Sequence, residues 1–323
     1  MTESSNTEPD GEKGLVTVVI PAFRARRYLP EALASVRAQT YRAWEIIVVD
    51  DCSPEPVDDL VKTFAATVPE NSVRLIRHPE NKGLGATRNT GIRAAAGEYV
   101  AFLDHDDCWR ETHLAVAVQA LESETAALAY CDFEQFEEKP GDLPGALSAD
   151  PQPWGPFPGS LYVHNFIAPS GVVMRKRTLE ELNLFAEIRA CEDLDLWLRA
   201  AGRGVKFVRV PKPNLLYRKH PQAATSSPRT IADARAEVIC RNLATVPQVP
   251  FSFRLKSLRT ACTEAAKGHG REEPARAAYF YALSCRQGPR LEMVWMKHAL
   301  AWFFYRTLAA LGVARARTQP PVK

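Results

Sequence analysis

Acidic side chains directly follow two apolar runs in the N-terminal half of the chain. Asp50 and Asp51 end one run, and residues 104–107, Asp-His-Asp-Asp, follow the run at 98–103. In a parallel α/β sheet, ligands bind where the carboxyl ends of the strands meet, so these carboxylates are expected to lie together. Like charges repel unless a cation joins them, and a hard divalent cation shared with substrate phosphates fits this pattern. The sequence therefore predicts a Mg²⁺ or Mn²⁺ site beside a phosphate-bearing ligand.

A glycine-rich segment, residues 81–89, reads Asn-Lys-Gly-Leu-Gly-Ala-Thr-Arg-Asn and opens a predicted helix. Its glycines permit a tight turn, and the N-terminus of the following helix favours an anion. Arg88 and Asn89 fall in the first turns of that helix, within reach of a base or a phosphate. The spacing fits neither the Walker A loop nor the dinucleotide fingerprint. The segment indicates either a nucleotide-binding loop or an ordinary helix cap.

A third motif, residues 191–199, combines carboxylates with an apolar helix face. Trp197 and its leucine neighbours form that face, whereas Glu192 and Asp193 fall at the start of the helix, where the helix dipole stabilises negative charge. The motif is therefore either a general base at the rim of a pocket or an acidic helix cap. Asp195 points away from Asp193 on a helix, which favours a structural role for it.

Two further segments have the residue types of a ligand site. The basic run at 217–220, Tyr-Arg-Lys-His, follows a predicted strand and indicates either a diphosphate clamp or a solvated charge run. Residues 151–169 are rich in Pro and aromatic side chains. Because sugar rings stack on aromatic faces, Trp154 and Tyr162 are candidates for the wall of an acceptor cavity. The alternative is a surface loop held by its own aromatic residues.

The elements that position these motifs alternate between strand and helix. Strands are predicted at 16–20, 45–50, 73–77, 98–103 and 127–132, with helices from Pro30 and at 57–67, 83–96 and 111–122. This rhythm predicts an α/β fold with a mostly parallel sheet and helices on both faces. Short helices at 178–184 and 192–201 and strands at 205–210 and 215–217 follow an irregular segment, 139–169. After Ser227 the pattern is wholly helical, with breaks at 247–250, 268–270 and 288–289 that suggest about four helices.

Composition and charge limit the class of protein. Hydrophobic residues make up 46% of the 323 residues, so a sizeable core is possible, and the seven cysteines are scattered without a paired motif. This cysteine usage argues against a disulfide framework or structural zinc and for a reducing cytosol. Residues 1–14 are polar and are expected to form a disordered tail without the character of a signal peptide. We therefore divide the chain into this tail, a catalytic domain at 15–228 and a basic helical extension at 229–323.

The extension differs in charge from the rest of the chain. Residues 230–323 hold fifteen Lys and Arg against six Asp and Glu, a charge of +9, whereas the whole chain has only +3. Such a segment suits an anionic partner, either a membrane surface, a phosphorylated acceptor or a nucleic acid, although a solvated helix face is the alternative. The apolar stretch at 291–313 is interrupted by Lys297 and Arg306, so no transmembrane helix is predicted. Its aromatic residues, Trp302 among them, favour an interfacial helix on the inner face of a membrane.

Taken together, the motifs resemble the family 2 glycosyltransferases with the GT-A fold. The resemblance covers about two thirds of the chain and rests on ordered matches at 16–23, 35–40, 48–53, 83–91, 97–107, 170–171, 192–199 and 217–220. One departure is Cys52, where the family usually has glycine in the turn after the paired aspartates. The pattern does not cover residues 230–323.

The resemblance implies a role for each matching residue. A nucleotide-diphosphate sugar, with UDP as the expected nucleotide, would contact Pro21, Ala22, Phe23, Asp51, Arg88, Asp104 and Arg218. Asp51 would accept a hydrogen bond from the base, and Asp104 would approach the ribose. Asp106 would ligate Mg²⁺ or Mn²⁺, with His220 as a second candidate ligand. Asp193 would be the general base, and Glu192 would lie near the acceptor.

These roles predict an inverting, metal-dependent glycosyltransferase of the hexosyltransferase type. A single displacement would move the sugar to a hydroxyl of a glycan, a lipid-linked or a small-molecule acceptor, in the synthesis of cell-surface polysaccharide or glycoconjugate. A nucleotidyltransferase is one alternative, but it usually has a Gly-rich basic loop after the first strand. A non-catalytic scaffold that binds sugar nucleotides is another, and it could lack Asp106 or Asp193. The sequence contains no recognised nucleic-acid-binding motif, so no nucleic-acid partner is expected.

Overall fold

The strands form one mixed sheet. The computed structural model describes residues 11–70, 72–142, 146–147, 149–222, 227–286 and 293–310. Its strand order is β3-β2-β1-β4-β8-β6-β9-β5, with β7 paired to β6. Pairing is parallel among β1 to β4 and between β6 and β9, whereas β8 runs antiparallel to both of its neighbours. The bounds are β1 (Glu12–Ala22), β2 (Trp44–Asp50), β3 (Val73–Arg77), β4 (Gly97–Phe102), β5 (Cys108–Trp109), β6 (Leu128–Phe136), β7 (Ala146–Leu147), β8 (Val172–Arg175) and β9 (Phe207–Arg218).

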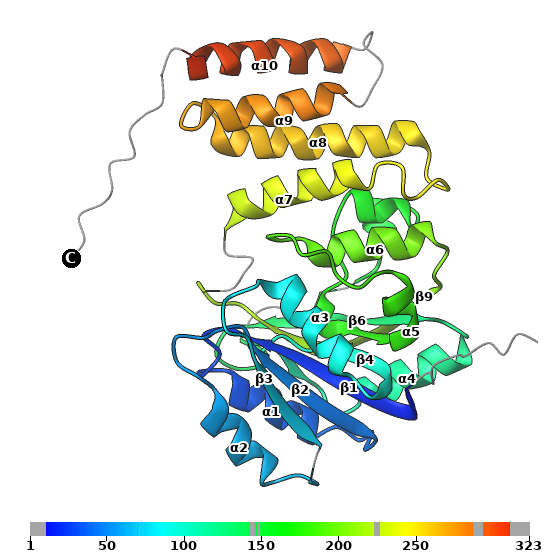
Figure 1. Cartoon of the computed structure of the whole chain (residues 1–323). Coiled ribbons are helices and arrows are strands. Elements are labelled where there is room, and N and C mark those ends of the chain that lie inside the picture. Colours follow the sequence, from blue (N-terminus) through cyan, green and yellow to red (C-terminus); the bar gives the residue numbers. More distant parts are fainter. Residues whose placement is uncertain are drawn as a thin grey trace, which may run out of the picture.

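Helices cover both faces of this sheet, as predicted (Figure 1). Successive side chains of a strand point to opposite faces, so Val18 and Val19 of β1 enter two different cores. The core that contains Val18 lies against α1 (Leu29–Arg37), α2 (Asp58–Ala65) and α4 (His113–Ser123). The core that contains Val19 lies against α3 (Leu84–Ala94), α5 (Lys176–Glu181) and α6 (Glu192–Gly202).

The first strand begins earlier than the sequence indicated. The amide of Glu12 donates to the carbonyl of Ala96, and the amide of Gly14 donates to the Glu98 carboxylate. Residues 12–14 therefore belong to β1 and not to a disordered tail, and residues 1–10 lie outside the described part of the chain. Gly11 permits this close approach, since a Cβ at that position would lie 2.6 Å from the Gly97 oxygen.

Two other strand predictions needed correction. The strands predicted at 205–210 and 215–217 are one strand, β9, because the register against β6 shifts around Asp132 and carries the chain past Pro211 and Pro213. Strand β8 was not predicted. It has only four residues and passes directly into α5, so it shows no strand period of useful length.

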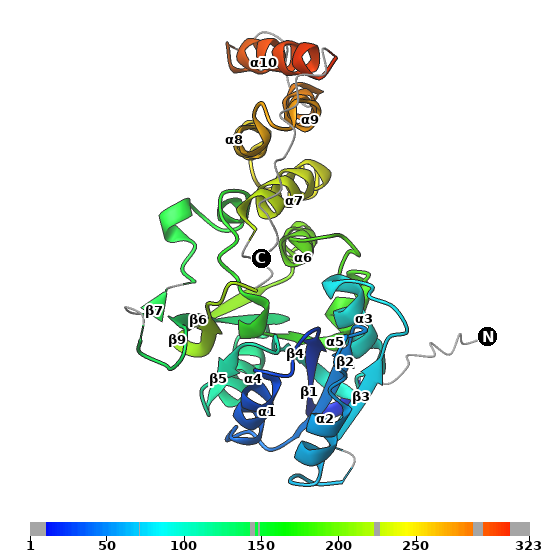
Figure 2. The ribbon, with the colours of Figure 1, turned by 90° about the vertical axis from the view of Figure 1, so that its left-hand side faces the viewer.

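The C-terminal helices stack outward from the catalytic domain. They are α7 (Pro228–Arg241), α8 (Phe251–His269), α9 (Pro274–Arg286) and α10 (Met293–Ala310). Figure 2 shows α7 next to α6 and each later helix farther from the sheet. The predicted helical extension is confirmed, although the break expected at 288–289 lies outside the described residues. Within the described part of the chain, no helix is both long and apolar enough to cross a membrane.

Candidate active site

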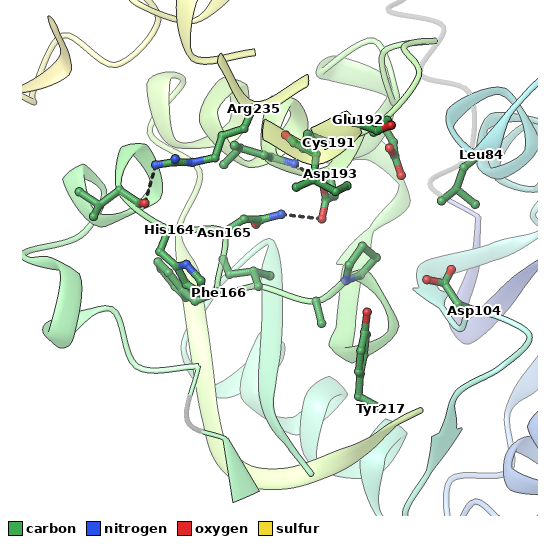
Figure 3. Close-up of a pocket in the computed structure, with 18 of the residues that line it drawn as sticks. Leu84, Asp104, His164, Asn165, Phe166, Cys191, Glu192, Asp193, Tyr217 and Arg235 are labelled. Carbon is green, nitrogen blue, oxygen red and sulfur yellow. Dashed lines mark hydrogen bonds between the residues drawn. The ribbon is translucent and has the colours of Figure 1, made fainter. Parts of the chain in front are cut away.

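A cavity of about 1240 Å³ lies between the carboxyl edge of the sheet, the start of α6 and the helices α7 and α8. It brings together predicted residues from four separate segments: Arg88, Asp104 and Asp106, Glu192 and Asp193, and Arg218. Figure 3 places Leu84 and Asp104 at one side of the view and His164 and Arg235 at the other, with Asp193 between them. The sheet therefore supplies one end of the cavity, and the helical extension supplies the other.

Asp51 holds the glycine-rich loop in place. One carboxylate oxygen accepts a hydrogen bond from the Lys82 amide and the other from the Gly83 amide, each at 2.9 Å. The ring of His78 donates to the same carboxylate at 2.7 Å. Asp51 is buried, and both of its oxygens have partners within the protein. Asp51 therefore shapes the loop in this structure, and its contact with a nucleotide base stays a prediction.

The loop itself depends on its glycines. Gly83 has φ +85°, in the region that favours glycine, and it precedes the first turn of α3. A Cβ on Gly85 would lie 2.5 Å from the Ala186 carbonyl oxygen, so only glycine allows this approach. Cys52 stands where the similar family usually has glycine, and it also has a positive φ, +60°. The turn after Asp51 therefore keeps the left-handed backbone with a small side chain.

Arg88 joins two ends of the site. Its guanidinium contacts the Asp104 carboxylate at 2.7 Å and the Glu192 carboxylate at 2.5 Å, and its side chain is buried. The sequence had suggested that Arg88 contacts a base or a diphosphate. Here it instead binds the end of β4 to the start of α6, which brings the donor-side carboxylate Asp104 and the predicted base into one rigid unit.

Asp193 faces the cavity at the first turn of α6. Cys191 is the N-cap residue of this helix, and its backbone has a left-handed conformation with φ +58°. The Asn165 amide donates to Asp193 at 2.8 Å, as Figure 3 shows, and the Leu194 amide donates to its other oxygen at 2.7 Å. Burial and the neighbouring Glu192 charge raise the pKa of Asp193 to about 6, while Asn165, Leu194 and Arg88 oppose this rise. A carboxyl with such a pKa is ionised near neutral pH and still accepts a proton readily.

The neighbouring carboxylates are bound elsewhere. Glu192 is buried against Arg88. Asp195 accepts hydrogen bonds from Arg199 at 2.7 Å and from Asn242 at 2.8 Å, so it has the structural role that the helix phase predicted. Of the three acidic side chains in this motif, Asp193 is the one whose carboxylate has no ion-pair partner among the described residues.

The residues after β4 form the predicted acidic turn. Asp106 Oδ2 lies 2.8 Å from His220 Nε2. Burial and the charges of Asp106 and Asp104 raise the pKa of Asp107 well above its usual range. The main-chain amide of Arg218 donates to the Asp107 carboxylate at 2.9 Å. Three carboxyl groups in four residues thus repel one another, and a cation would relieve that repulsion.

Asp106 and His220 fit a divalent cation. Their facing atoms are 2.8 Å apart, close to the ~3 Å between neighbouring ligands of an octahedral ion with bonds of 2.0–2.1 Å. Within the described residues, no group of three or more His, Cys, Asp and Glu side chains could hold a metal by itself. Two protein ligands suffice for Mg²⁺ or Mn²⁺ when substrate phosphates supply others. The donor set therefore suits a metal that binds together with a diphosphate.

Arg218 braces this turn. Its guanidinium donates to the carbonyls of Asp106 and Glu137 and to the Glu31 carboxylate, and it lies between the rings of Tyr28 and Phe136. The sequence had suggested that Arg218 clamps a diphosphate. In the structure the side chain lines the cavity, but three protein acceptors already bind its donors.

The predicted residues at the end of β1 lie at the same sheet edge but outside the lining of the cavity. Pro21 and Ala22 are buried, and the His105 ring donates to the Pro21 carbonyl at 3.2 Å. Phe23 has an exposed ring beside the Arg24 guanidinium. Their contact with a nucleotide stays a prediction.

Of the two aromatic residues proposed for the acceptor wall, Tyr162 belongs to the cavity lining and Trp154 does not. Tyr162 is 0% exposed and its hydroxyl donates to the Asn242 carbonyl, so in this structure its ring cannot stack on a sugar. Trp154 is not part of the cavity lining. It stacks on His164 and Phe166, which do line the cavity, with ring centroids 4.2 and 5.9 Å away. The segment thus supplies the wall through His164, Asn165 and Phe166.

The sequence reasoning missed several lining residues: Asn165, Arg189, Arg235 and Lys256. Asn165 lies in the irregular aromatic segment, where no periodicity shows which side chains point inward. Arg235 and Lys256 lie on α7 and α8, and the basic charge of the extension was the only signal that pointed to them.

Comparison with known sequences shows which protein family has the motifs of this site. The sequence model of Glycosyl transferase family 2 matches residues 17–179, half of the chain. The chain belongs to this family. An uncharacterized glycosyltransferase of Rickettsia felis is 30% identical over 58% of the chain, and the match spans only 30% of that relative. The Escherichia coli UDP-Glc:alpha-D-GlcNAc-diphosphoundecaprenol beta-1,3-glucosyltransferase WfaP is 26% identical over 66% of the chain and 80% of its own length.

Solved structures share the fold of this family 2 chain. Residues 1–349 of TarS from S. aureus, in complex with UDP, superpose with a TM-score of 0.69 at 16% identity, over 96% of this chain and 94% of that one. A Pyrobaculum calidifontis mannosyltransferase in complex with GDP-Man and Mn²⁺ superposes with a TM-score of 0.55 at 19% identity, over 91% and 86%. At these identities the likeness concerns the GT-A-like fold. The TarS match extends over α7–α10 as well as the sheet.

Proposed function

We propose that this protein transfers a sugar from a nucleotide-diphosphate donor, with UDP as the nucleotide, to an acceptor hydroxyl with inversion. The observation that carries the proposal is the position of Asp193. Its carboxylate, with a pKa of about 6, faces the cavity, and the Arg88 bridge joins the adjacent residue Glu192 to Asp104 at the end of β4. A proton acceptor and a site suited to a diphosphate thus share one cavity.

Three residues of the cavity lining, Asp193, Asn165 and Arg88, have defined tasks in this reaction. Asp193 takes the proton of the acceptor hydroxyl as that oxygen attacks the anomeric carbon opposite the leaving nucleotide. Asn165 orients the carboxylate through its hydrogen bond. Arg88 fixes Glu192 and Asp104 so that the base and the donor end keep their relative position, which lowers the entropic cost of aligning the two substrates. One displacement inverts the configuration, and no covalent nucleophile is required.

Asp106 and His220 would hold Mg²⁺ or Mn²⁺ against the donor diphosphate. Such an ion stabilises the negative charge that builds up on the departing nucleoside diphosphate. The Mn²⁺ in the Pyrobaculum mannosyltransferase supports this assignment. Arg218 contributes indirectly, because it holds the main chain of the turn that bears Asp106.

The relatives support the choice of donor and pathway. TarS is known in complex with UDP, and the name of WfaP specifies a UDP-sugar donor and an undecaprenol-linked acceptor. We therefore favour a UDP-sugar donor, a lipid-linked or glycan acceptor and a role in cell-surface polysaccharide synthesis. A location on the inner, cytoplasmic face of a membrane suits such an acceptor, and α10 exposes Leu300 and Phe303 for that contact.

Replacing Asp193 tests this proposal. Asp193→Asn keeps the shape and removes the basicity, so kcat should fall by ~10²–10⁴-fold while UDP affinity stays near that of the wild type. Glu192→Gln is the matched variant, because it neutralises the adjacent carboxylate. Near wild-type kcat in Asp193→Asn together with an inactive Glu192→Gln would assign the base to Glu192.

A further inference from the structure

The side chain that orients Asp193 comes from a segment without regular secondary structure. Asn165 donates to Asp193 at 2.8 Å, and residues 164–168 lie in neither a helix nor a strand. The side-chain carbonyl oxygen of Asn165 is buried and has no hydrogen-bond partner among the described residues, so no second bond holds this amide in place. The position of Asn165 therefore depends on what holds the main chain and the side chains next to it.

Arg235 ties this segment to the helical extension. From α7, its guanidinium donates to the Val163 carbonyl at 2.6 Å and to the Glu264 carboxylate of α8 at 2.8 Å. Figure 3 shows the bond to the main chain beside the bond between Asn165 and Asp193. The guanidinium is a rigid planar fork, so the contact with α8 on one side fixes the direction of the contact with the main chain on the other. The chain two residues before Asn165 is thus held by α7 and α8 together.

The side chains on either side of Asn165 have a different support. His164 and Phe166 both stack on the ring of Trp154, with ring centroids 4.2 and 5.9 Å away. This support comes from the irregular segment itself, whereas Arg235 brings in the extension. Arg235 is therefore the contact through which the helices after the catalytic domain reach the base.

We propose that Arg235 is a positioning residue for the general base, because it holds the segment that places Asn165 against Asp193. This inference rests on the proposed transferase function and adds to it a residue from outside residues 17–179, the part that matches the family model. The extension thereby completes the site in which the acceptor hydroxyl loses its proton.

The charged groups around Asp193 determine how a displaced Asn165 would be detected. Burial and the Glu192 charge raise the pKa of Asp193, whereas the Asn165 bond and the Arg88 charge lower it. The Cys191 thiol stays protonated, because burial raises its pKa to about 12. Losing the Asn165 bond removes a contact that favours the ionised carboxylate. The pKa of Asp193 should then rise further, by about one unit for a bond to a charged group.

The pH dependence of kcat/KM in four proteins tests the inference: the wild type, Arg235→Met, Asn165→Leu and the double variant. Asn165→Leu should move the midpoint of the rising limb upward from about 6 by about one unit, and Arg235→Met should move it in the same direction. Misplacing the base should also lower kcat in Arg235→Met by ~10-fold or more. Both substitutions remove the same bond, so the double variant should resemble Asn165→Leu alone.

Arg229→Met is the matched control. Arg229 also lies on α7 and pairs with Glu272 and Glu273 at 3.2 and 3.1 Å, but it is outside the cavity lining. Its loss should leave the midpoint unchanged, because it does not contact the segment that bears Asn165.

His164 is the other titratable side chain beside Arg235, and burial and the Arg235 charge lower its pKa. Its contribution to the profile is measured in Arg235→Met combined with Asp193→Asn. A limb that remains there belongs to His164 and is subtracted from the profile of Arg235→Met.

Glu264→Ala provides a second variant that does not threaten the fold, because this carboxylate is exposed. Without Glu264 the guanidinium of Arg235 loses its anchor on α8, so the midpoint should move upward by less than in Arg235→Met. If Arg235→Met does not fold, the profile of Glu264→Ala decides, and a wild-type midpoint there overturns the inference.

Two results with a folded Arg235→Met would overturn the inference. One is a wild-type midpoint in that variant. The other is a shift that adds in full to the shift of Asn165→Leu, since an effect of the Arg235 charge through space would persist without Asn165. A rising limb that persists in Asp193→Asn would instead count against the proposed function, whatever the Arg235 variants give.

Discussion

Arg88 and Arg218 at the sheet end of the cavity are bound within the protein, whereas Arg189, Lys219 and Lys256 of the same lining form no ion pair among the described residues. Arg88 and Arg218 are buried between protein acceptors, and Asp51 is fixed by main-chain amides. Arg189 and Lys256 are exposed and unpaired among the described residues. The contrast shows that buried charges of the site hold its geometry through bonds within the protein, whereas its exposed cations are open to the cavity.

At the sheet end of the cavity, we expect Asp106→Ala to have the largest effect on activity. Removing this carboxylate should abolish Mn²⁺-dependent UDP binding and lower activity by ~10²-fold or more, since a catalytic cation stabilises the leaving group by several kcal/mol. Calorimetry with UDP, with and without Mn²⁺, measures the change. Asp58→Ala, which removes an exposed carboxylate of α2, is the control. Undiminished transfer by Asp106→Ala, or by the wild type in excess chelator, would exclude the metal site.

Arg88→Met tests whether the bridge between Asp104 and Glu192 also holds the fold. Removing one partner of a buried ion pair leaves uncompensated charge, so the free energy of unfolding should fall by ~3–5 kcal/mol. Arg26→Met is the matched control, because Arg26 pairs with Asp59 at the surface, where the expected loss is ~0–1 kcal/mol. Equal urea midpoints for the two variants would contradict the structural role of Arg88.

A smaller effect is expected at the outermost helix, α10, where Leu300 and Phe303 are 71% and 65% exposed. Changing both to Ser should reduce flotation with anionic vesicles by about tenfold or more, since burying each side chain in a membrane contributes ~1.5–3 kcal/mol. Phe251→Ser, an exposed aromatic of α8, controls for general hydrophobicity. If the full-length protein and the α10 variant float equally poorly, the helix does not bind membranes.

The positions of the acidic residues were predictable from sequence, because strand ends and helix starts are local signals. Residues 104–107 follow a buried strand, and Asp193 begins a helix with a clear apolar face. The partners of Arg88 and Asp51 were not predictable. Arg88 contacts Glu192, which lies 104 residues away in the sequence. A sequence motif can place an arginine near a binding site, but it does not show which carboxylate that arginine will bind.

The side of the cavity that the helical extension forms was less predictable than the acidic residues. The sequence indicated helices and a positive charge, but the face of α8 that meets the cavity depends on how α7 packs against α6. Asn165 lies in an irregular segment with no period, so its contact with Asp193 required the three-dimensional structure. Local patterns thus identified the chemistry, whereas long-range packing decided which side chains surround the base.

The central claim, that Asp193 is the general base, is tested most directly by the pH dependence of kcat/KM. Because only the ionised carboxylate accepts a proton, and because the pKa of Asp193 is raised to about 6, activity should rise with pH through that value and level off above it. The profile is measured with saturating donor and limiting acceptor, for the wild type and for Asp193→Asn. The account predicts a rising limb with a midpoint near 6 in the wild type that is absent from the residual activity of the variant. A rising limb that persists in Asp193→Asn would contradict it.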